Sequence, residues 1–493
     1  MFSPAIYYTT LVGFCLFGDV VADSSPCNNG NPIVTHPIPP GGKALDSYTV
    51  EVRSIMHKGE PHNVLPFLVD VAEANTTSGA SIIHHTSVAY FDFCDPVNIS
   101  VTYNHGSIHS AVVRPYSYNI TPSVNGNTIT FSLPSPKNVV VQVNDEIWDV
   151  LHLFTNNIET NIPRLSDPNI VYFGPGLNNN RAASNLTGGE LLVPSGKRVY
   201  VASGATVTVP LVFDSVVDAR ILGRGVLRKG GVQVRRSSHI IIQDVVLIDS
   251  NVGIYESSNV TVHGIRSFSS GAWGDGIDSY CSHNVMVDSV FMRNSDDNIA
   301  FYQHRDTWYG NSSNLTIQNA SLWADYAHPI NIGTHGNSAN PETMDGVTIR
   351  NIDVLDHREP QMWYQGCLAI NVGDSNLVKN VLVDKMRVEN FREGQLVNLR
   401  VMNGSKYNTS PGRGIQDVYI KNLSYQGTNA NPSWVLGYDS QRVISNVTFD
   451  NLVVNGQRIY DAMEKPSWYF TADFVPMFAN EHVHDLRFVV SEP

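Results

Sequence analysis

The second half of the chain repeats a short pattern in which aliphatic and polar residues alternate and an Asn or Asp usually follows. The pattern occurs eight times, at intervals of 20 to 37 residues. Its copies begin at Ile240, Val260, Val285, Leu315, Val347, Val381, Val418 and Val447. No amphipathic helix separates the copies, which argues against β-α-β units, and Leu is not periodic as in a leucine-rich horseshoe. The repeats therefore predict a parallel β-helix, in which each copy is one coil and stacking buries the aliphatic positions.

A different pattern fills residues 45–165. Short segments of alternating apolar and polar residues, such as SYTVEVRSI, VNISVTYN and NTITFSLPS, are separated by turn residues. Alternation with period two indicates half-buried strands, and closely spaced turns are typical of an antiparallel sandwich. Residues 23–44 are rich in Pro, Gly and Asn and are expected to form an ordered arm or linker. The chain is thus expected to be all-β, with a β-sandwich at 45–165 and a β-helical catalytic domain at 166–493.

The N-terminus has the features of a signal peptide at residues 1–22. The apolar run from Tyr7 to Gly18 is too short to span a bilayer, and the small residues that end at Ala22 form a cleavage signature. Twelve N-x-[ST] sequons agree with secretion and predict a glycoprotein: Asn75, Asn98, Asn119, Asn185, Asn259, Asn311, Asn314, Asn319, Asn403, Asn408, Asn422 and Asn446. We therefore expect a secreted, extracellular protein.

Charge and cysteine content narrow the function classes. The 493 residues carry a formal net charge of −13 without a basic stripe, which argues against nucleic acid and anionic membranes as partners. No Cys-x-x-Cys or His/Cys cluster suggests zinc, and we expect a monomer without cofactor or metal. The mature chain retains Cys27, Cys94, Cys281 and Cys367, which allow three pairings. A disulfide between Cys27 and Cys94 is favoured because both flank the first domain.

Three acidic residues are close together in the sequence that runs from GDGID to SDDN. Asp275 precedes Asp297 by 22 residues, and Asp296 is adjacent to Asp297. Successive coils of a β-helix lie ~4.8 Å apart, so equivalent positions can be aligned. The aligned tripeptides are Val252–Ile254, Asp275–Ile277, Asp297–Ile299 and His328–Ile330. This alignment predicts a column of Val252, Asp275, Asp297 and His328, with Asp296 beside it.

Acids that are held this close raise one another's pKa, so that one can donate a proton while another accepts one. Such a pair suits glycoside hydrolysis by inversion, in which an acid protonates the leaving oxygen and a carboxylate activates water. The room for that water predicts a separation of roughly 6.5–9.5 Å between the carboxyl groups of Asp296 and Asp275. Asp278 has two open interpretations, as a turn cap or as a residue that lines the substrate cleft.

These motifs resemble those of the β-helical glycoside hydrolase clan that contains polygalacturonases (family 28) and dextranases with isopullulanases (family 49). Polygalacturonases carry an N-T-D-G-[FI]-D motif, an Asp-Asp pair about one coil later, and a G-H-G motif beyond. This chain has GDGID, SDDN and AHPINIG. Its region from VVRPYSYN to TNNIE resembles the β-sandwich of family 49, so the overall layout is closer to that family. The resemblance implies a right-handed, pectin-lyase-like β-helix.

The resemblance also implies roles for individual residues. Asp296 would be the general acid, Asp275 and Asp297 would hold the attacking water, and His328 would be an auxiliary group. Two positions depart from the polygalacturonase pattern, since Gly274 replaces a Thr and Pro329 replaces the second Gly of G-H-G.

The substrate is predicted from what the chain lacks and what surrounds the acids. Where polygalacturonases carry an R-I-K motif that grips a uronate, this chain has Leu368, Ala369 and Ile370. An apolar trio cannot pair with a carboxylate, so a neutral α-glucan such as dextran or pullulan is favoured over pectic or other plant-wall glycans. Aromatic side chains near the acids are expected to be sugar platforms. They are Trp273, Trp308, Tyr309, Trp323, Trp363 and Tyr364. If the substrate is pectic, Arg305 and Arg358 are the first candidates for a relocated clamp.

Two rival functions remain open on sequence grounds. A polysaccharide lyase on the same fold needs a cationic base and often calcium, and no Arg or Lys lies in the predicted column, although the acids could hold calcium. A non-catalytic carbohydrate-binding protein or adhesin would not need the acidic column at all.

Overall fold

The computed structural model describes residues 32–57, 59–75, 78–160, 162–179, 186–187, 189–464 and 475–491. The predicted signal peptide and Cys27 lie outside these ranges, so the pairing of Cys27 with Cys94 stays a prediction. Cys281 and Cys367 are buried and unpaired. Within the described ranges the helices are two 3₁₀ turns, η2 (Tyr116–Tyr118) and η3 (Met362–Tyr364), and none could cross a membrane. The expected all-β class is therefore confirmed.

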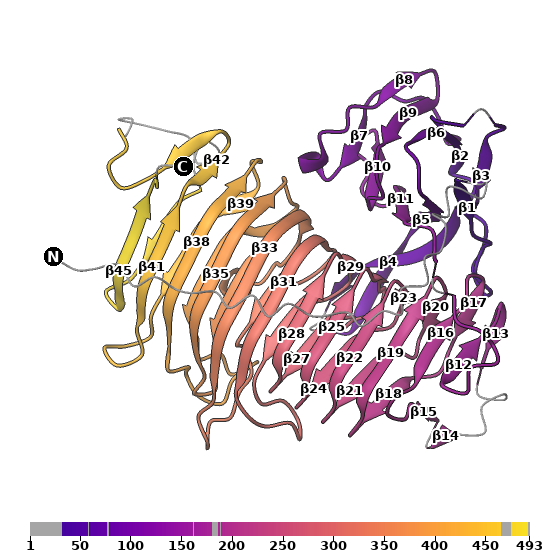
Figure 1. Ribbon diagram of the computed structural model, residues 1–493. Coiled ribbons are helices and arrows are strands. Elements are labelled where there is room, and N and C mark those ends of the chain that lie inside the picture. The colour runs from indigo at the N-terminus through magenta and orange to yellow at the C-terminus, as the bar shows by residue number, and fades with distance from the viewer. Residues whose placement is uncertain are drawn as a thin grey trace.

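The N-terminal part consists of two sheets (Figure 1). Buried apolar side chains between them form one core. The first sheet contains β1 (Ile33–Thr35), β4 (Phe67–Asn75), β5 (Ala80–Phe93), β7 (Ala111–Arg114), β10 (Val139–Val143) and β11 (Leu151–Asn156). The second contains β2 (Tyr48–Ser54), β3 (His62–Val64), β6 (Val97–Tyr103), β8 (Ser123–Asn125) and β9 (Thr128–Leu133). Two details differ from expectation. The first sheet is mixed, because β11 runs parallel to β5, and the arm contributes a strand, because β1 pairs with β5.

The rest of the chain winds into a right-handed parallel β-helix, as expected (Figure 1). One wall is a twelve-stranded sheet. Its strands are β14 (Leu186–Thr187), β15 (Glu190–Leu192), β18 (Leu211–Asp214), β21 (Val232–Arg235), β24 (Val252–Tyr255), β27 (Ile277–Tyr280), β30 (Ile299–Tyr302), β32 (Ile330–Ile332), β34 (Leu368–Val372), β37 (Val397–Val401), β40 (Ser433–Leu436) and β44 (Met477–Ala479).

The remaining walls belong to a twenty-stranded sheet. Its strands are β12 (Ile170–Phe173), β13 (Gly176–Asn178), β16 (Arg198–Val201), β17 (Ala205–Val207), β19 (Val217–Gly223), β20 (Val226–Arg228), β22 (Ser238–Gln243), β23 (Val246–Ile248), β25 (Ser258–His263), β26 (Arg266–Phe268), β28 (His283–Asp288), β29 (Phe291–Asn294), β31 (Ser312–Ala324), β33 (Thr343–His357), β35 (Leu377–Val388), β38 (Gly414–Tyr425), β41 (Ile444–Asp450), β42 (Leu452–Val454), β43 (Gln457–Ile459) and β45 (Val483–Val489). A short pair outside both sheets joins β36 (Gly394–Gln395) to β39 (Ala430–Asn431).

The eight sequence repeats are the eight strands β22, β25, β28, β31, β33, β35, β38 and β41, and their first residues stand opposite one another in parallel register. The fifth position of every repeat has a positive φ, between 53° and 64°. Asn tolerates this left-handed conformation better than most residues, which explains its recurrence. Side chains at these corners also bond between coils, as when Asn351 Nδ2 donates to Asn319 Oδ1 at 2.7 Å.

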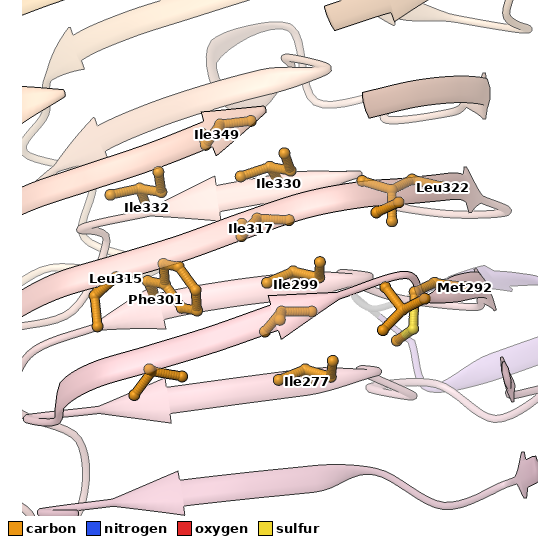
Figure 2. Close-up of a cluster of buried hydrophobic side chains, with 14 of the residues drawn as sticks. Ile277, Met292, Ile299, Phe301, Leu315, Ile317, Leu322, Ile330, Ile332 and Ile349 are labelled. Atoms are coloured by element: carbon orange, nitrogen blue, oxygen red, sulfur yellow. The ribbon is translucent and has the colours of Figure 1, made fainter. Parts of the chain in front are cut away.

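Aliphatic side chains fill the interior of the β-helix. On the twelve-stranded wall, Ile277, Ile299 and Ile330 stack in register, and all three are fully buried (Figure 2). Each buried aliphatic side chain contributes roughly 1.5–3 kcal/mol relative to exposure, so the stack fixes the register of the coils. Since each loop that enters β27, β30 and β32 is anchored by one of these residues, the side chains just before them are held at adjacent heights.

The sandwich lies against the β-helix along a second apolar cluster. Residues of β4, β5 and β11 contact outward-facing residues of successive coils, which include Phe268, Phe291 and Trp323. Arg293, which is fully buried, lies over the Trp323 ring and pairs with Asp325 at 2.9 Å. The two domains therefore share an interior and form one continuous body at this contact.

Candidate active site

The predicted acidic column exists in the structure. Asp275, Asp297 and His328 each stand two residues before the stacked isoleucines of β27, β30 and β32, so they occupy equivalent places on successive coils. The predicted fourth member is wrong. Val252 pairs with Ile277, and its side chain is in the core, so the alignment of that coil was displaced by two residues.

Asp297 is the most firmly held carboxylate of the group. Its Oδ1 accepts hydrogen bonds from the His328 ring at 2.7 Å and from the His328 backbone N–H at 3.0 Å. Its Oδ2 accepts from the Tyr302 hydroxyl at 3.0 Å and from Asn331 Nδ2 at 2.8 Å. Burial alone would raise the pKa of Asp297, but the charge and hydrogen bonds of His328 and the amide of Asn331 lower it below its ordinary value. Asp297 is thus ionised at neutral pH.

His328 is the counterion of that carboxylate. It is fully buried, and while Nδ1 faces Asp297, Nε2 faces the backbone carbonyl of Tyr364, so both ring nitrogens have acceptors. Burial lowers the pKa of His328, but Asp297 outweighs burial and raises it to about 9. A doubly protonated imidazolium satisfies both acceptors at neutral pH.

Asp296 and Asp275 have the opposite electrostatic character. Burial, together with the charge of Asp297, raises the pKa of Asp296 well above its ordinary value. Burial, followed by the charges of Asp278, Asp296 and Asp297, does the same for Asp275. Both side chains are only partly covered, so each can meet a substrate. The group therefore contains one fixed carboxylate and two acids that hold protons readily.

The three acids lie close together. One oxygen of each of Asp275, Asp296 and Asp297 lies within 4.8 Å of the others. The cause is twofold. Successive coils are one interstrand spacing apart, and the Asp297 N–H donates to Asp296 Oδ1 at 3.0 Å, which turns that carboxyl group toward the column. Within the described ranges this is the one acidic group with the spacing to hold a metal ion.

Three further residues complete the site, and the sequence analysis missed them. Tyr302 and Asn331 hold Asp297 from outward positions of β30 and β32, positions that strict alternation along the strands would have indicated. Glu359 is 1% exposed, and burial raises its pKa to about 7, although His328 opposes the shift. It comes from a loop, for which the repeat gives no register. Asp278 lies inside strand β27 and not at a turn, and burial followed by the nearby charge of Asp297 raises its pKa to about 7.

Gly274, which departs from the polygalacturonase pattern, has a steric explanation. A Cβ atom at this position would lie 2.5 Å from Ser295 Oγ and 2.8 Å from Ser269 Oγ. These two serines hold the loop before Asp275, because Ser269 donates to the Gly274 carbonyl and Ser295 to the Gly271 carbonyl, each at 2.5 Å. The two serine hydroxyls, which bond to backbone carbonyls of this loop, thus occupy the space that a Thr side chain at position 274 would need.

The aromatic residues predicted as sugar platforms divide into two groups. Trp273 and Trp363 are 66% and 65% exposed, and Tyr309 is also exposed. Trp308 is partly covered, since it stacks on Tyr255 at 5.1 Å between ring centroids. Exposed aromatic faces suit contact with sugar rings, and Trp273 shares a cavity wall with Asp275.

The remaining two aromatic residues are not platforms. Trp323 is 0% exposed and lies between the domains, where its indole Nε1 donates to Asp325 Oδ1 at 3.1 Å. Tyr364 is 7% exposed, and its hydroxyl is bonded to Asn331 and Thr334, each at 3.0 Å. Tyr364 positions His328 through its backbone carbonyl and Asn331 through its hydroxyl.

The Trp323→Ala variant is expected to lose about 3–5 kcal/mol in free energy of unfolding, because a large cavity opens between the domains. Denaturant unfolding would measure this loss, and the milder Trp323→Phe variant serves if Trp323→Ala does not fold. If the Trp323→Ala variant kept its stability and its KM for polysaccharide rose, Trp323 would be a sugar platform after all.

The prediction that Leu368, Ala369 and Ile370 occupy the place of a uronate-binding motif is also wrong. Leu368 and Ile370 are fully buried in the core of the β-helix, so their side chains do not face the cleft. Alternation puts Ala369 and Asn371 on the outer face of β34. On the next coil Arg400 stands opposite Asn371, and its guanidinium donates to the Trp363 carbonyl at 2.7 Å.

The two other candidate cations occupy different places. Arg305 is exposed, contacts His335 Nε2 at 2.6 Å, and lies near enough to lower the pKa of Asp278. Arg358 lies 3.9 Å from Glu73 of the sandwich and faces the Tyr326 ring. Arg305 therefore lies near the acidic group and Arg400 lies beside Trp363, whereas Arg358 joins the domains.

Comparisons with known proteins agree with this architecture, although no family model matches the chain. The sequence is 27% identical over 202 residues, 36% of this chain, to an exopolygalacturonase of Cochliobolus carbonum. It is 26% identical over 197 residues, again 36% of this chain, to exopolygalacturonase X of Aspergillus niger. The chain spans 42% of the length of each of these curated relatives.

Among solved structures, Dex49A from Penicillium minioluteum has a TM-score of 0.59 at 12% identity, and the match covers 93% of this chain and 96% of that one. The fold of Dex49A thus extends over both domains. The resemblance to the β-helical clan of polygalacturonases and dextranases is confirmed, with sequence matches to the first branch and a shared fold with the second.

Proposed function

We propose that the protein is an inverting glycoside hydrolase that cleaves a polysaccharide. The observation that carries the proposal is the contrast between two adjacent acids. Asp297 has a pKa lowered by His328, whereas burial and Asp297 raise the pKa of Asp296. Two titratable groups whose environments separate their pKa values are the usual basis of acid and base roles in one site.

In this mechanism Asp296 protonates the glycosidic oxygen as the bond to the leaving sugar breaks. Asp275, in its ionised form, and Asp297 flank a water molecule on the opposite side of the ring, and the proton of that water passes to Asp275 as the water oxygen bonds to the anomeric carbon, while Asp297 keeps its negative charge. His328 keeps Asp297 ionised and fixed in direction, and Tyr302 and Asn331 hold its second oxygen. Three acids are needed because one, Asp296, donates the proton to the leaving sugar, while the other two, Asp275 and Asp297, position the attacking water.

The substrate class has two candidates. A neutral α-glucan of the dextran or pullulan type is supported by the exposed indoles of Trp273 and Trp363 and by the net charge of −13. A pectic substrate is favoured by Arg305 near the acidic group, by Arg400 beside Trp363 and by the likeness to exopolygalacturonases. In either case we propose a secreted, extracellular monomer whose partner is a polysaccharide.

Incubation with dextran, pullulan and polygalacturonate, followed by analysis of the products, tests the proposal. Hydrolysis is expected to release reducing ends without ultraviolet absorbance from an unsaturated uronate. Products that carry that absorbance would identify a lyase, and binding without any product would identify a carbohydrate-binding protein. Faster release from polygalacturonate than from either glucan would assign the pectic class.

A further inference from the structure

A cavity of about 670 Å³ lies beside Asp275 and has walls from both domains. The sandwich contributes Gly79, Ser81 and Ile83, which lie at and beside the connection between β4 and β5. The β-helix contributes Lys229, residues 249–251 and residues 269–275. Because Asp275 itself lines this cavity, a ligand there would be continuous with one bound at the acids.

Trp273 presents a large apolar face at this cavity. It is 66% exposed, and its indole lies against Gly79 of the sandwich, since a Cβ atom on Gly79 would be 3.2 Å from the ring. Its φ is 58°, a left-handed conformation that costs free energy for a bulky residue. Such strain persists where the surroundings enforce it and clusters at ligand sites. Ile83, which is 48% exposed, supplies a second apolar surface from the sandwich.

Polar groups line the rest of the cavity. Asp249 Oδ1 is held by the backbone N–H of Ser270 at 3.0 Å and by its hydroxyl at 2.9 Å. Asn251 Nδ2 donates to Asp278 Oδ2 at 3.4 Å, which joins this wall to the acidic group. Lys229 is exposed and forms no ion pair with any described residue. An aromatic face together with several fixed donors and acceptors suits a pyranose ring and its hydroxyl groups.

We propose that this cavity is a substrate subsite for one pyranose unit of the polysaccharide, with Trp273 as its platform and Gly79, Ser81 and Ile83 of the sandwich as its outer wall. The inference rests on the proposed function and extends it. It gives the sandwich a direct part in substrate binding, and it makes these three residues a determinant of the chain length that the enzyme prefers.

The test compares Trp273→Ala and Ile83→Ser with the wild type on oligosaccharides of increasing length from whichever polysaccharide the enzyme cleaves. For Trp273→Ala, kcat/KM is expected to fall about 10- to 100-fold on the longer oligosaccharides, because the contact between the indole face and a sugar ring is lost, and to change less than about threefold on the shortest one cleaved. Trp273→Phe should restore most of the loss. Tyr172→Ala, which alters an exposed aromatic residue of β12 outside the cavity, is the control and should match the wild type.

A direct binding measurement uses an inactive Asp296→Asn protein. Its tryptophan fluorescence should change on addition of a long oligosaccharide, and the change should be smaller in Asp296→Asn/Trp273→Phe. Equal losses on short and long substrates, or none in either cavity variant, would overturn the subsite while leaving hydrolysis intact. A wild type that cleaves no polysaccharide would instead overturn the proposed function.

Discussion

The Asp296→Asn variant is expected to lose turnover by about 10²–10⁴-fold while it folds normally, because an amide keeps the shape of a protonated acid but cannot protonate a leaving group. The side-chain oxygen can still accept from the Asp297 N–H. The raised pKa of Asp296 means that its ionisation opposes folding as the pH rises above the value in the unfolded chain. Stability at neutral pH should therefore equal or exceed that of the wild type.

Steady-state kinetics and thermal unfolding measured on the same preparation check both parts of this prediction. Asp218→Asn is the matched control, because Asp218 is exposed on the twenty-stranded sheet, and it should leave both quantities unchanged. Turnover of Asp296→Asn within a factor of ten of the wild type would remove Asp296 from the acid role.

The Asp297→Asn variant should lose both activity and stability. Turnover is expected to fall about 10²–10⁴-fold, since the water loses a carboxylate. The fully buried His328 imidazolium would also lose its counterion, and breaking a buried ion pair in this way costs about 3–5 kcal/mol. Asp296→Asn, which removes the neighbouring acid, is the matched control and should not show the loss of stability.

The stability difference between wild type and Asp297→Asn should depend on pH. The pKa of His328 is raised from 6.5 to about 9, so the contribution of the pair is fully present below pH 6.5 and is lost as the pH rises through about 9. The pKa of Asp297 is lowered by folding, so the contribution of the pair is also lost in strong acid, as the pH falls through the lowered pKa of Asp297. Denaturant unfolding at several pH values measures the difference. A difference that stays constant from pH 6 to pH 10 would contradict the ion pair.

Most of the fold could be predicted from the sequence because a β-helix repeats one interaction. The aliphatic positions that begin at Ile240 and recur to Val447 stand opposite one another in the structure, so the sequence period defines the stacking. The same logic found the column of Asp275, Asp297 and His328, since interstrand spacing converts residues far apart in sequence into neighbours.

The incorrect predictions concern two kinds of position. For some the repeat gives no register, and for others the alternating direction of side chains along a strand decides whether a residue is buried. Alternation along β34 would have assigned Leu368 and Ile370 to the core, in phase with Ile330 and Ile332. Trp323 could not be placed from the sequence, because its burial depends on which coils the sandwich covers. That contact joins segments far apart in the chain and leaves no local pattern.

The close approach of the acids makes stereochemistry the most informative property of the reaction. Two-acid retaining enzymes have carboxyl groups about 5–5.5 Å apart and two-acid inverting enzymes about 6.5–9.5 Å. Here the nearest oxygens of three acids lie within 4.8 Å. Because four hydrogen bonds commit the oxygens of Asp297, we expect Asp297 to act through its charge beside the water rather than to attack the sugar.

Proton NMR of the sugar released in the first minutes of hydrolysis tests this account most directly. With an α-linked substrate, the anomeric signal that appears first should belong to the β-anomer, and the α-anomer should grow in later by mutarotation. That order is the result of a single displacement by water held between Asp275 and Asp297. Initial release of the α-anomer would mean a covalent intermediate and would contradict the roles assigned to all three acids.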